Sequence, residues 1–154
     1  MSTKPVRLDG IRLLFIAACV AGVMVCGPGI AHAGEVKFPC VGEVNTDRVN
    51  LRAGRSLNYE ILAQLDKGKR VTVCGFRSGW FRIIPPEGVY FWVSNRYVSG
   101  GRVTPGRLNV RVKPSANSTV ACQLSRGARV EAIETRGEWT SIKPPRDAYL
   151  WVSS

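Results

Sequence analysis

The sequence contains almost no histidine, and this lack excludes the commonest hydrolytic chemistry. Among 154 residues there is one histidine, His32, and it lies in an N-terminal segment that we expect to be removed. Cys–His and Ser–His–Asp sites both need an imidazole base beside the nucleophile. The acidic residues are few and lie in turn-like positions, so they do not indicate a catalytic carboxylate pair. We therefore predict no catalytic residue, no cofactor and no enzymatic activity.

Cysteine is also scarce. Three cysteines lie beyond residue 33, namely Cys40, Cys74 and Cys122. Their spacing is far too wide for a metal-binding motif, so we predict no metal site. Cys74 and Cys122 fall at apolar strand positions, which favours buried, unreactive thiols. In an oxidising compartment one pair could still form a disulfide and leave one thiol over, and the sequence does not say which.

Helical periodicity is absent except in the first 33 residues. Lys4, Arg7 and Arg12 precede an uncharged apolar run over residues 13–30, and Ala31-His32-Ala33 then supplies small residues at positions −3 and −1. This pattern is typical of a secretory signal peptide, here expected to be helical, with cleavage between Ala33 and Gly34.

Two alternatives to cleavage remain, an uncleaved anchor and a lipoprotein modified at Cys19. The run is close to the ~20 residues of a membrane span, but glycine and proline interrupt it. We expect an exported protein of the periplasm or cell surface, which meets the membrane only transiently through its signal segment.

One stretch of the sequence occurs twice. Residues 80–94 read WFRIIPPEGVYFWVS and residues 139–153 read WTSIKPPRDAYLWVS, at an offset of 59. At this offset 20 of the 51 positions from 44 to 94 are identical, without a gap. Because chance would give only a few identities, the chain is a tandem duplication. We assign residues 1–33 to the signal, 38–98 to a first domain and 99–154 to a second.

Each copy has the pattern of short β-strands. Residues 48–52 and 80–84 alternate polar with apolar side chains, as half-buried strands do. Gly68 is expected at positive φ in a turn, and Ser78-Gly79 indicates a tight hairpin. Residues 90–93 form an apolar run, expected to be a closing strand buried on both faces. The second copy ends sooner, at Ser154, so we expect its last strand to be clipped; whether the protein ends there is open.

Arginine and lysine outnumber acidic residues. The chain has 22 basic and 11 acidic residues, and removal of the signal would leave a net charge of +9. An exported protein of this charge is expected to meet wall polymers, lipid head groups or acidic protein surfaces. Nucleic acid fits the charge but not the compartment, and we do not expect it. Basic loop residues could line up as one cationic strip or be scattered over the surface.

The order of these motifs resembles a bacterial SH3-type (SH3b) domain, present twice. The resemblance rests on Leu-Asn-Val-Arg-like openings at residues 49–52 and 108–111, a Gly turn, a mid-domain tryptophan (Trp80, Trp139) and a closing Trp-Val pair (residues 92–93 and 151–152). It covers essentially all of the chain after the signal. The Pro-Pro pair before each closing strand departs from the commonest pattern. The resemblance implies an all-β chain of two tandem SH3-like antiparallel β-barrels with a non-catalytic role in the bacterial envelope.

Aromatic residues near the loops are the candidate ligand contacts, because SH3-like barrels receive extended peptides between aromatic loops. The candidates are Tyr59, Trp80, Phe81, Tyr90, Trp139 and Tyr149. Tyr59 is replaced by Ser118 in the second copy, which favours a site in the first. The alternative is that the tryptophans fill a small core, which we favour for Trp92 and leave open for Trp80.

Two further residue pairs recur in both copies, Asn50/Asn109 and Arg52/Arg111. They could contact a ligand, but an Asn-x-Arg at a strand end more often ties down a neighbouring loop by hydrogen bonds. We predict the second role.

The sequence thus favours a non-catalytic, exported binding module that recognises peptidoglycan or wall peptides. The alternative is a protein-interaction module that docks short peptides of envelope proteins, possibly at the front of a longer chain. The ligand, the relative orientation of the two domains and the oligomeric state are left open.

Overall fold

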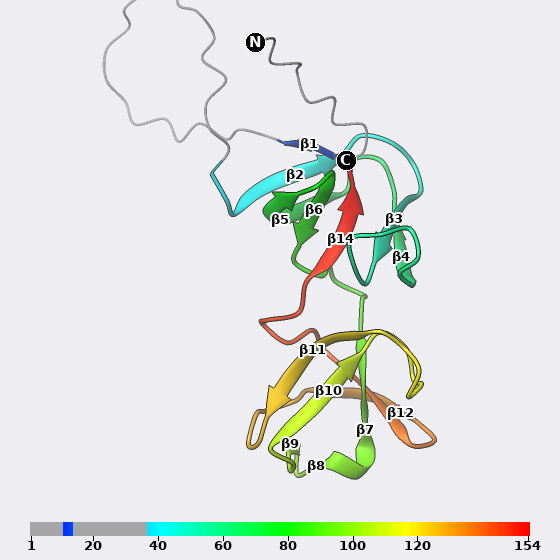
Figure 1. Cartoon of the computed structure of the whole chain (residues 1–154), viewed down its shortest axis with the longest axis vertical. Coiled ribbons are helices and arrows are strands. Elements are labelled where there is room, and N and C mark those ends of the chain that lie inside the picture. Colours follow the sequence, from blue (N-terminus) through cyan, green and yellow to red (C-terminus); the bar gives the residue numbers. More distant parts are fainter. Residues whose placement is uncertain (1–10, 14–36) are drawn as a thin grey trace, which may run out of the picture.

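The described part of the protein is all-β, as the sequence predicts. The computed structural model describes residues 11–13 and 37–154, which contain fourteen strands, one 3₁₀ turn and no α-helix. The strands form two lobes stacked along the long axis of the molecule (Figure 1). Every strand pair is antiparallel.

The first lobe is a seven-stranded sheet in the order β1–β2–β5–β6–β14–β3–β4. Its strands are β1 (Ile11–Leu13), β2 (Cys40–Val44), β3 (Val49–Arg52), β4 (Ile61–Leu65), β5 (Arg70–Arg77), β6 (Trp80–Ile83) and β14 (Leu150–Ser153). The second lobe is a five-stranded sheet in the order β11–β10–β7–β13–β12. Its strands are β7 (Phe91–Ser94), β10 (Arg107–Arg111), β11 (Val120–Ser125), β12 (Ala132–Arg136) and β13 (Trp139–Ile142). A small ribbon follows β7, made of the 3₁₀ turn η1 (Asn95–Tyr97), β8 (Val98–Ser99) and β9 (Arg102–Val103).

The two repeats exchange their closing strands. β7 belongs by sequence to the first repeat, but it lies between β10 and β13 of the second lobe, with Phe91 opposite Ile142. β14 belongs to the second repeat, but it lies between β3 and β6 of the first lobe, with Leu150 opposite Ile83. Each lobe therefore contains strands from both repeats, and the sequence ranges 38–98 and 99–154 do not coincide with the lobes.

The exchanged strands complete both hydrophobic cores. Phe91 and Val93 have no exposed surface, and neither have Leu150 and Val152. Trp92 lies between the first two and is only half-buried. The closing strand therefore alternates and buries one face, which corrects the prediction of a strand buried on both faces. β14 has the same four-residue length as β7.

The Pro-Pro pairs lie in the two segments that cross between the lobes, residues 84–90 and 143–149. In Figure 1 both segments run through the waist of the molecule. Ile84 and Lys143 donate backbone hydrogen bonds to Thr72 and Glu131, and after them Pro85-Pro86 and Pro144-Pro145 offer no amide donors. A pair of prolines favours extended backbone, so the chain leaves its own lobe instead of turning back onto it.

The turns follow the sequence predictions. Gly68 has φ 83° and its counterpart Gly127 has φ 80°. Ser78 and Gly79 both have positive φ, 50° and 79°, which is the geometry of a type I′ turn between β5 and β6.

The predicted signal segment, residues 1–33, and with it the expected helix, lies outside the described residues except for β1. β1 forms the edge of the first sheet and pairs with β2, with Ile11 opposite Val44. Export and cleavage therefore stay predictions. No helix in the described part of the chain is long and apolar enough to cross a membrane.

The first loop differs between the repeats at two positions, and the sizes of the two side chains compensate for each other. A Cβ on Gly54 would lie 2.7 Å from three ring atoms of Tyr59, so the absence of a side chain makes room for the ring. At the corresponding positions the second repeat has Lys113 and Ser118. There the small serine hydroxyl accepts a hydrogen bond from the Lys113 amide at 3.0 Å.

Gly54→Ala is expected to destabilise the protein by about 1–3 kcal/mol, because the new methyl group must displace the Tyr59 ring. Urea unfolding measures the loss. The double variant Gly54→Ala with Tyr59→Ser should recover most of it, since it reproduces the small residue of the second repeat. Equal stability of Gly54→Ala and the unaltered protein would contradict this packing.

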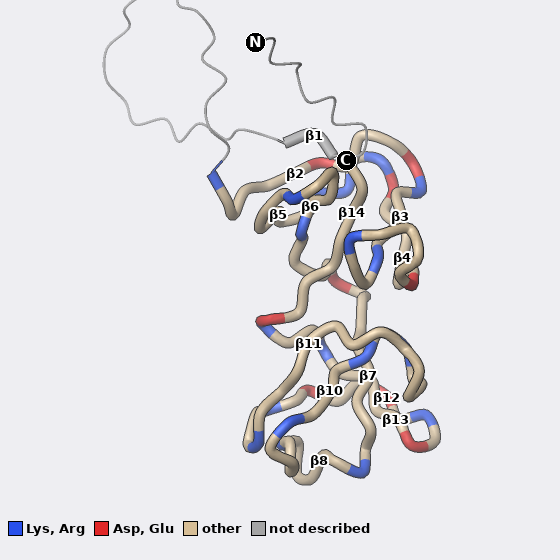
Figure 2. Tube along the Cα trace, viewed as in Figure 1, with Lys and Arg blue, Asp and Glu red and all other residues tan. Residues whose placement is uncertain are grey.

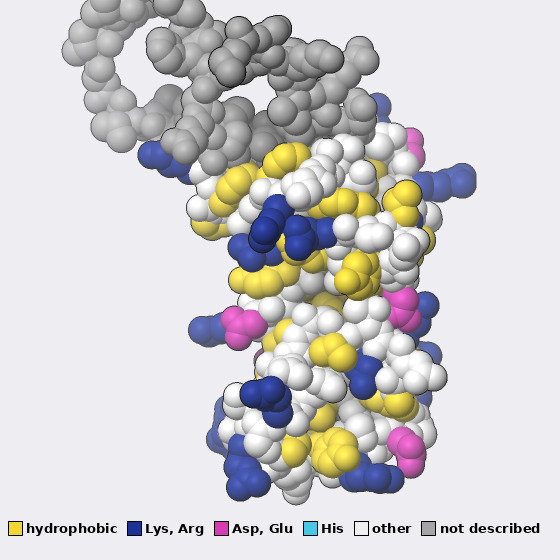
Figure 3. Space-filling view, viewed as in Figure 1, with side chains coloured by type: hydrophobic (Ala, Val, Ile, Leu, Met, Phe, Trp, Pro, Cys, Tyr) yellow, Lys and Arg dark blue, Asp and Glu magenta, His cyan; other side chains and the backbone are white. Residues whose placement is uncertain are grey.

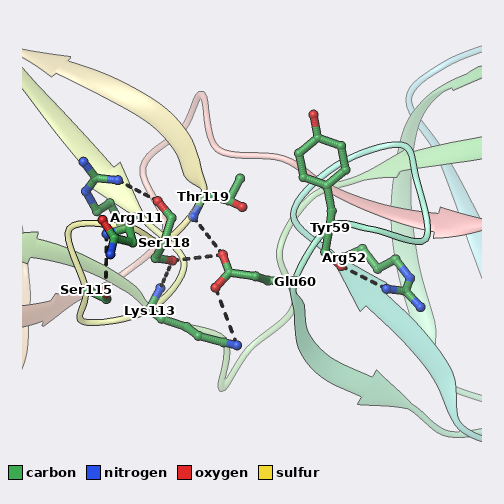
Figure 4. Close-up of polar contacts among 9 residues, drawn as sticks. Arg52, Tyr59, Glu60, Arg111, Lys113, Ser115, Ser118 and Thr119 are labelled. Atoms are coloured by element: carbon green, nitrogen blue, oxygen red, sulfur yellow. Dashed lines mark hydrogen bonds and ion pairs between the residues drawn. The ribbon is translucent and has the colours of Figure 1, made fainter.

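One carboxylate joins the two lobes at the waist. Glu60 of the first repeat accepts hydrogen bonds from the Thr119 amide at 2.8 Å and the Ser118 hydroxyl at 3.0 Å, and Lys113 lies 3.5 Å away (Figure 4). Burial opposes ionisation of Glu60, but the hydrogen bonds from Thr119 and Ser118 and the charge of Lys113 together outweigh it. The pKa of Glu60 is therefore lowered.

The contact between the lobes is consequently expected to weaken in acid. A carboxyl whose folded-state pKa is lowered stabilises the protein above its unfolded-state pKa, about 4.3, and this contribution is lost as the pH falls through the lower folded value. Thermal unfolding between pH 6 and 3 should show the loss. Glu60→Gln should lower the melting temperature at pH 6 and flatten its pH dependence. A variant with the same acid slope as the unaltered protein would show that other carboxyls dominate.

Candidate functional site

A groove on the second lobe lies beside Trp139, one of the predicted site residues. It has a volume of about 460 Å³. Trp139 begins β13, and it lies opposite Ser94 of the exchanged strand β7. The lining residues come from β7 and η1, from β10 and from the loops on either side: Ser94, Arg96, Tyr97, Pro105, Arg107, Leu108, Asn109, Arg111, Ala116, Glu138 and Trp139. The groove is therefore made by both repeats.

The first lobe has an equivalent groove beside Trp80, with a volume of about 240 Å³. It is lined by Thr46, Val49, Asn50, Arg52, Leu57, Trp80, Ser153 and Ser154. Most of these residues correspond, at the offset of 59, to residues that line the Trp139 groove. The same fold has thus formed the same concave feature twice.

Asn50 and Arg52 serve the structure around these grooves, and so do their counterparts. The Asn50 and Asn109 side-chain oxygens accept hydrogen bonds from Gln64 and Gln123 on the neighbouring strand. Arg52 donates to the backbone oxygens of Leu57 and Tyr59, at 2.8 and 2.9 Å. Arg111 donates to the Ser118 oxygen at 2.6 Å. The predicted loop-fixing role is confirmed for the two arginines, whereas the two asparagines bond to the neighbouring strand.

The larger groove carries more charge and more aromatic surface than the smaller one. Tyr97 is 42% exposed, and no counterpart lines the first groove. Arg96 lies 3.8 Å from Glu138, and both side chains are largely exposed, so the pair is weak and adjustable. Arg107 adds a further cation to the lining. Aromatic side chains beside exposed, weakly paired charges suit an extended, polar ligand.

The six aromatic residues predicted from the sequence do not form one site. Trp80 and Trp139 line the two equivalent grooves, in different lobes. Phe81 is 1% exposed and packs in the core, so no ligand can reach it. Tyr90 is exposed at the connecting segments, in a separate hollow with both Pro-Pro pairs.

Tyr149 and Tyr59 also lie outside the grooves. Tyr149 is half-buried beneath the Arg82 guanidinium, 4.6 Å from the ring centre. Tyr59 is 44% exposed and stacks on Gly54, but it is not among the residues that line the Trp80 groove. Figure 4 shows its ring pointing away from the Glu60 cluster.

Trp92 and Trp151 correct another prediction. Trp92 was expected in the core, but in both closing strands the tryptophan faces away from it and stays half-buried. Arg136 covers Trp92 at 5.6 Å and Arg55 covers Trp151 at 5.3 Å. The core aromatic residues are Phe81 and Phe91 instead. In a strand with one buried face, only one of two adjacent side chains points into the core.

The three described cysteines are unbridged and half-buried. Burial, with a smaller contribution from the nearby Asp147 carboxylate, raises the pKa of Cys122 to about 11. Burial and the neighbouring Cys74 raise that of Cys40. The thiols of Cys40 and Cys122 are therefore poor nucleophiles at neutral pH, which agrees with the unreactive character predicted for Cys122. The described residues contain no cluster of side chains that could hold a metal ion.

Sequence reasoning missed the groove residues that come from the other repeat. Ser94 and Tyr97 line the Trp139 groove, and Ser153 lines the Trp80 groove, only because β7 and β14 are exchanged. The Pro-Pro pairs were the available signal, since they mark the crossing segments. Basic residues are scattered rather than aligned: Figure 2 shows Lys and Arg on both lobes and on both sides of the molecule.

Comparison with known proteins identifies both repeats of the chain. The family described as "Bacterial SH3 domain" matches residues 47–99 and 106–154. A protein of Bacillus subtilis (strain 168), printed as "Putative N-acetylmuramoyl-L-alanine amidase YrvJ", is 24% identical over 132 residues. The match covers 73% of this chain but only 25% of that protein, so the chain spans about a quarter of its relative's length. No solved structure matches.

Proposed function

Because this chain belongs to the bacterial SH3 domain family, with two copies in tandem, we propose that it is a non-catalytic binding module of the bacterial cell envelope. In this proposal the Trp139 groove recognises peptidoglycan or its peptides, and the Trp80 groove contributes more weakly. The observation that carries it is the pair of equivalent grooves, each with a tryptophan and a loop fixed by the arginine of an Asn-x-Arg motif.

The ligand class follows from the groove chemistry and from the relative. The groove is open and shallow, and aromatic surface lies next to exposed charged side chains. Such a surface suits an extended peptide or a sugar–peptide strand better than a small, enclosed ligand. The relative's printed name refers to an amidase of N-acetylmuramoyl-L-alanine, a linkage of the wall, which supports a wall ligand.

The test is co-sedimentation of the 34–154 chain with insoluble peptidoglycan at low and moderate salt. Retention should survive moderate salt and should fall at least about tenfold for Trp139→Ala, with a smaller loss for Trp80→Ala, because truncation of an aromatic hot-spot residue costs about 2 kcal/mol or more. Trp92→Ala is the matched control: it removes a half-buried tryptophan outside the grooves. Unchanged retention of Trp139→Ala would overturn the assigned site.

Docking of short peptides from envelope proteins is the second candidate function. The groove at Tyr97 and Trp139 favours it, since aromatic pockets of this kind accept extended peptides. A chain that fails to sediment with peptidoglycan at either salt concentration, but retains an envelope protein through Trp139, would favour this function.

Export is part of the proposal. The predicted cleavage after Ala33 would remove β1 and leave β2 as the edge of the first sheet. Mass spectrometry of the mature protein recovered from cells checks this: an N-terminus at Gly34 is expected, and an intact or acylated N-terminal segment would contradict it.

A further inference from the structure

A second hollow lies on the first lobe, away from both tryptophan grooves. Its volume is about 320 Å³, and it is lined by Arg55, Gly75, Phe76, Arg77, Arg82 and Trp151. It shares no lining residue with the grooves at Trp80 and Trp139. Figure 3 shows basic side chains gathered over the region of β5, β6 and β14, with apolar side chains next to them.

The hollow has three guanidinium groups, those of Arg55, Arg77 and Arg82, and two of them are held against aromatic rings. Arg55 lies over the Trp151 ring and Arg82 over the Tyr149 ring, at 5.3 and 4.6 Å. Arg82 also donates one hydrogen bond to the Cys74 carbonyl at 3.2 Å. Within residues 11–13 and 37–154, no carboxylate forms an ion pair with any of the three. Stacking holds the flat face of a guanidinium against an aromatic ring and leaves the N–H groups at its edge free to donate to an anion.

The second lobe shows that the fold does not need this cluster. At the corresponding positions it has Pro114 for Arg55, Ser141 for Arg82 and Glu134 for Gly75. The one arginine that is kept, Arg136, is held by Glu134 through two hydrogen bonds of 2.9 and 3.1 Å. Gly75 and Glu134 both lie at a β-bulge between corresponding strands. The first lobe therefore has three unpaired charges where the second has a closed ion pair.

We propose that this hollow, the arginine site, binds a phosphate group of an anionic polymer. Three separate guanidinium groups suit the several oxygens of a tetrahedral phosphate better than the two oxygens of a planar carboxylate. Phe76 is 41% exposed and Trp151 is half-buried, so they offer apolar surface to the carbon chain or ring beside the phosphate. Such a site anchors a phosphodiester-linked wall polymer.

The experiment titrates the intact protein with inorganic phosphate and with poly(glycerol phosphate), followed by tryptophan fluorescence. The polymer should bind more tightly than inorganic phosphate, because it reaches the aromatic surface as well. Gly75→Glu places a carboxylate beside Arg77, as Glu134 does beside Arg136, and should weaken binding of both at least about tenfold, since hydrogen bonds to charged groups contribute about 1.5–3 kcal/mol each. Arg77→Gln, at an exposed position, should weaken it similarly and reduce the salt dependence of polymer binding by about one charge.

Two controls keep the arginine site separate from the proposed function. Arg136→Gln alters the corresponding residue of the second lobe and should leave phosphate binding unchanged. Trp139→Ala should lose peptidoglycan and keep phosphate, so failure of one proposal is distinguishable from failure of the other. Equal binding by Gly75→Glu, Arg77→Gln and the unaltered protein would overturn the site. Tighter binding of single-stranded DNA than of poly(glycerol phosphate) would overturn the wall-polymer assignment.

Discussion

Phe91→Ala is expected to unfold the second lobe and leave the first largely intact. Phe91 belongs by sequence to the first repeat, but its side chain is fully buried among β7, β10 and β13, opposite Ile142. Truncation of a buried phenylalanine costs about 3–5 kcal/mol, a large part of the stability of a lobe this small. Hydrogen exchange should therefore lose protection in β10–β13 and keep it in β3–β6.

Leu150→Ala is the mirror experiment. Leu150 comes from the second repeat, but it lies opposite Ile83 in the first lobe, so its loss should deprotect β3–β6. If Phe91→Ala unfolds both lobes together, the milder variant Phe91→Leu still allows hydrogen exchange to show which lobe loses protection. A double-mutant cycle should find coupling of about 0.5–3 kcal/mol between Phe91 and Ile142 and little between Phe91 and Ile83. The reverse pattern would mean that each repeat closes on itself.

The repeat, the strands and the turns could be predicted from the sequence because they depend on local pattern. Alternation marks β3 and β6, and the turn at Ser78-Gly79 needs positive φ, which glycine tolerates. The partner of each closing strand could not be predicted in this way. β7 has the sequence FWVS and β14 has the sequence LWVS. The alternation of apolar residues alone therefore lets either strand close either lobe. The Pro-Pro pairs are visible in both copies of the repeat, but the crossing of the two connecting segments that decides the partner is not.

The site could be predicted in part for the same reason. Trp80 and Trp139 were found because a tryptophan at a fixed place in a repeat is visible in the sequence, and both line grooves. Phe81 was a wrong candidate, because it follows Trp80 in β6 and its side chain therefore points to the opposite face, into the core. The arginine site was not found at all. Trp151 is 96 positions from Arg55, and only the exchanged strand brings it to the five lining residues of the first repeat.

A fragment that contains the first repeat alone, residues 37–99, is expected to form a dimer by exchange of β7. Without β14 the first lobe lacks its closing strand, and β7 of a second copy can take that place with Phe91 opposite Ile83 and Val93 opposite Phe81. The rigid Pro85-Pro86 segment favours reaching a neighbour over turning back. Sedimentation equilibrium should give twice the mass of the fragment, while the whole chain is expected to stay monomeric under the same conditions.

Two variants of the fragment test the role of the connecting segment and of Glu60 in dimer formation. Replacing Pro85 and Pro86 by glycine gives the connecting segment freedom to turn back, and it should shift the fragment towards a closed monomer. In the dimer each Glu60 would face the other Glu60 in place of Thr119, and two carboxylates so placed repel each other. Glu60→Thr, which introduces the residue of the second repeat, should therefore strengthen the dimer at neutral pH. A fragment that is monomeric with Pro85-Pro86 intact would show that the exchange comes from the pairing of unequal repeats and not from the connecting segment.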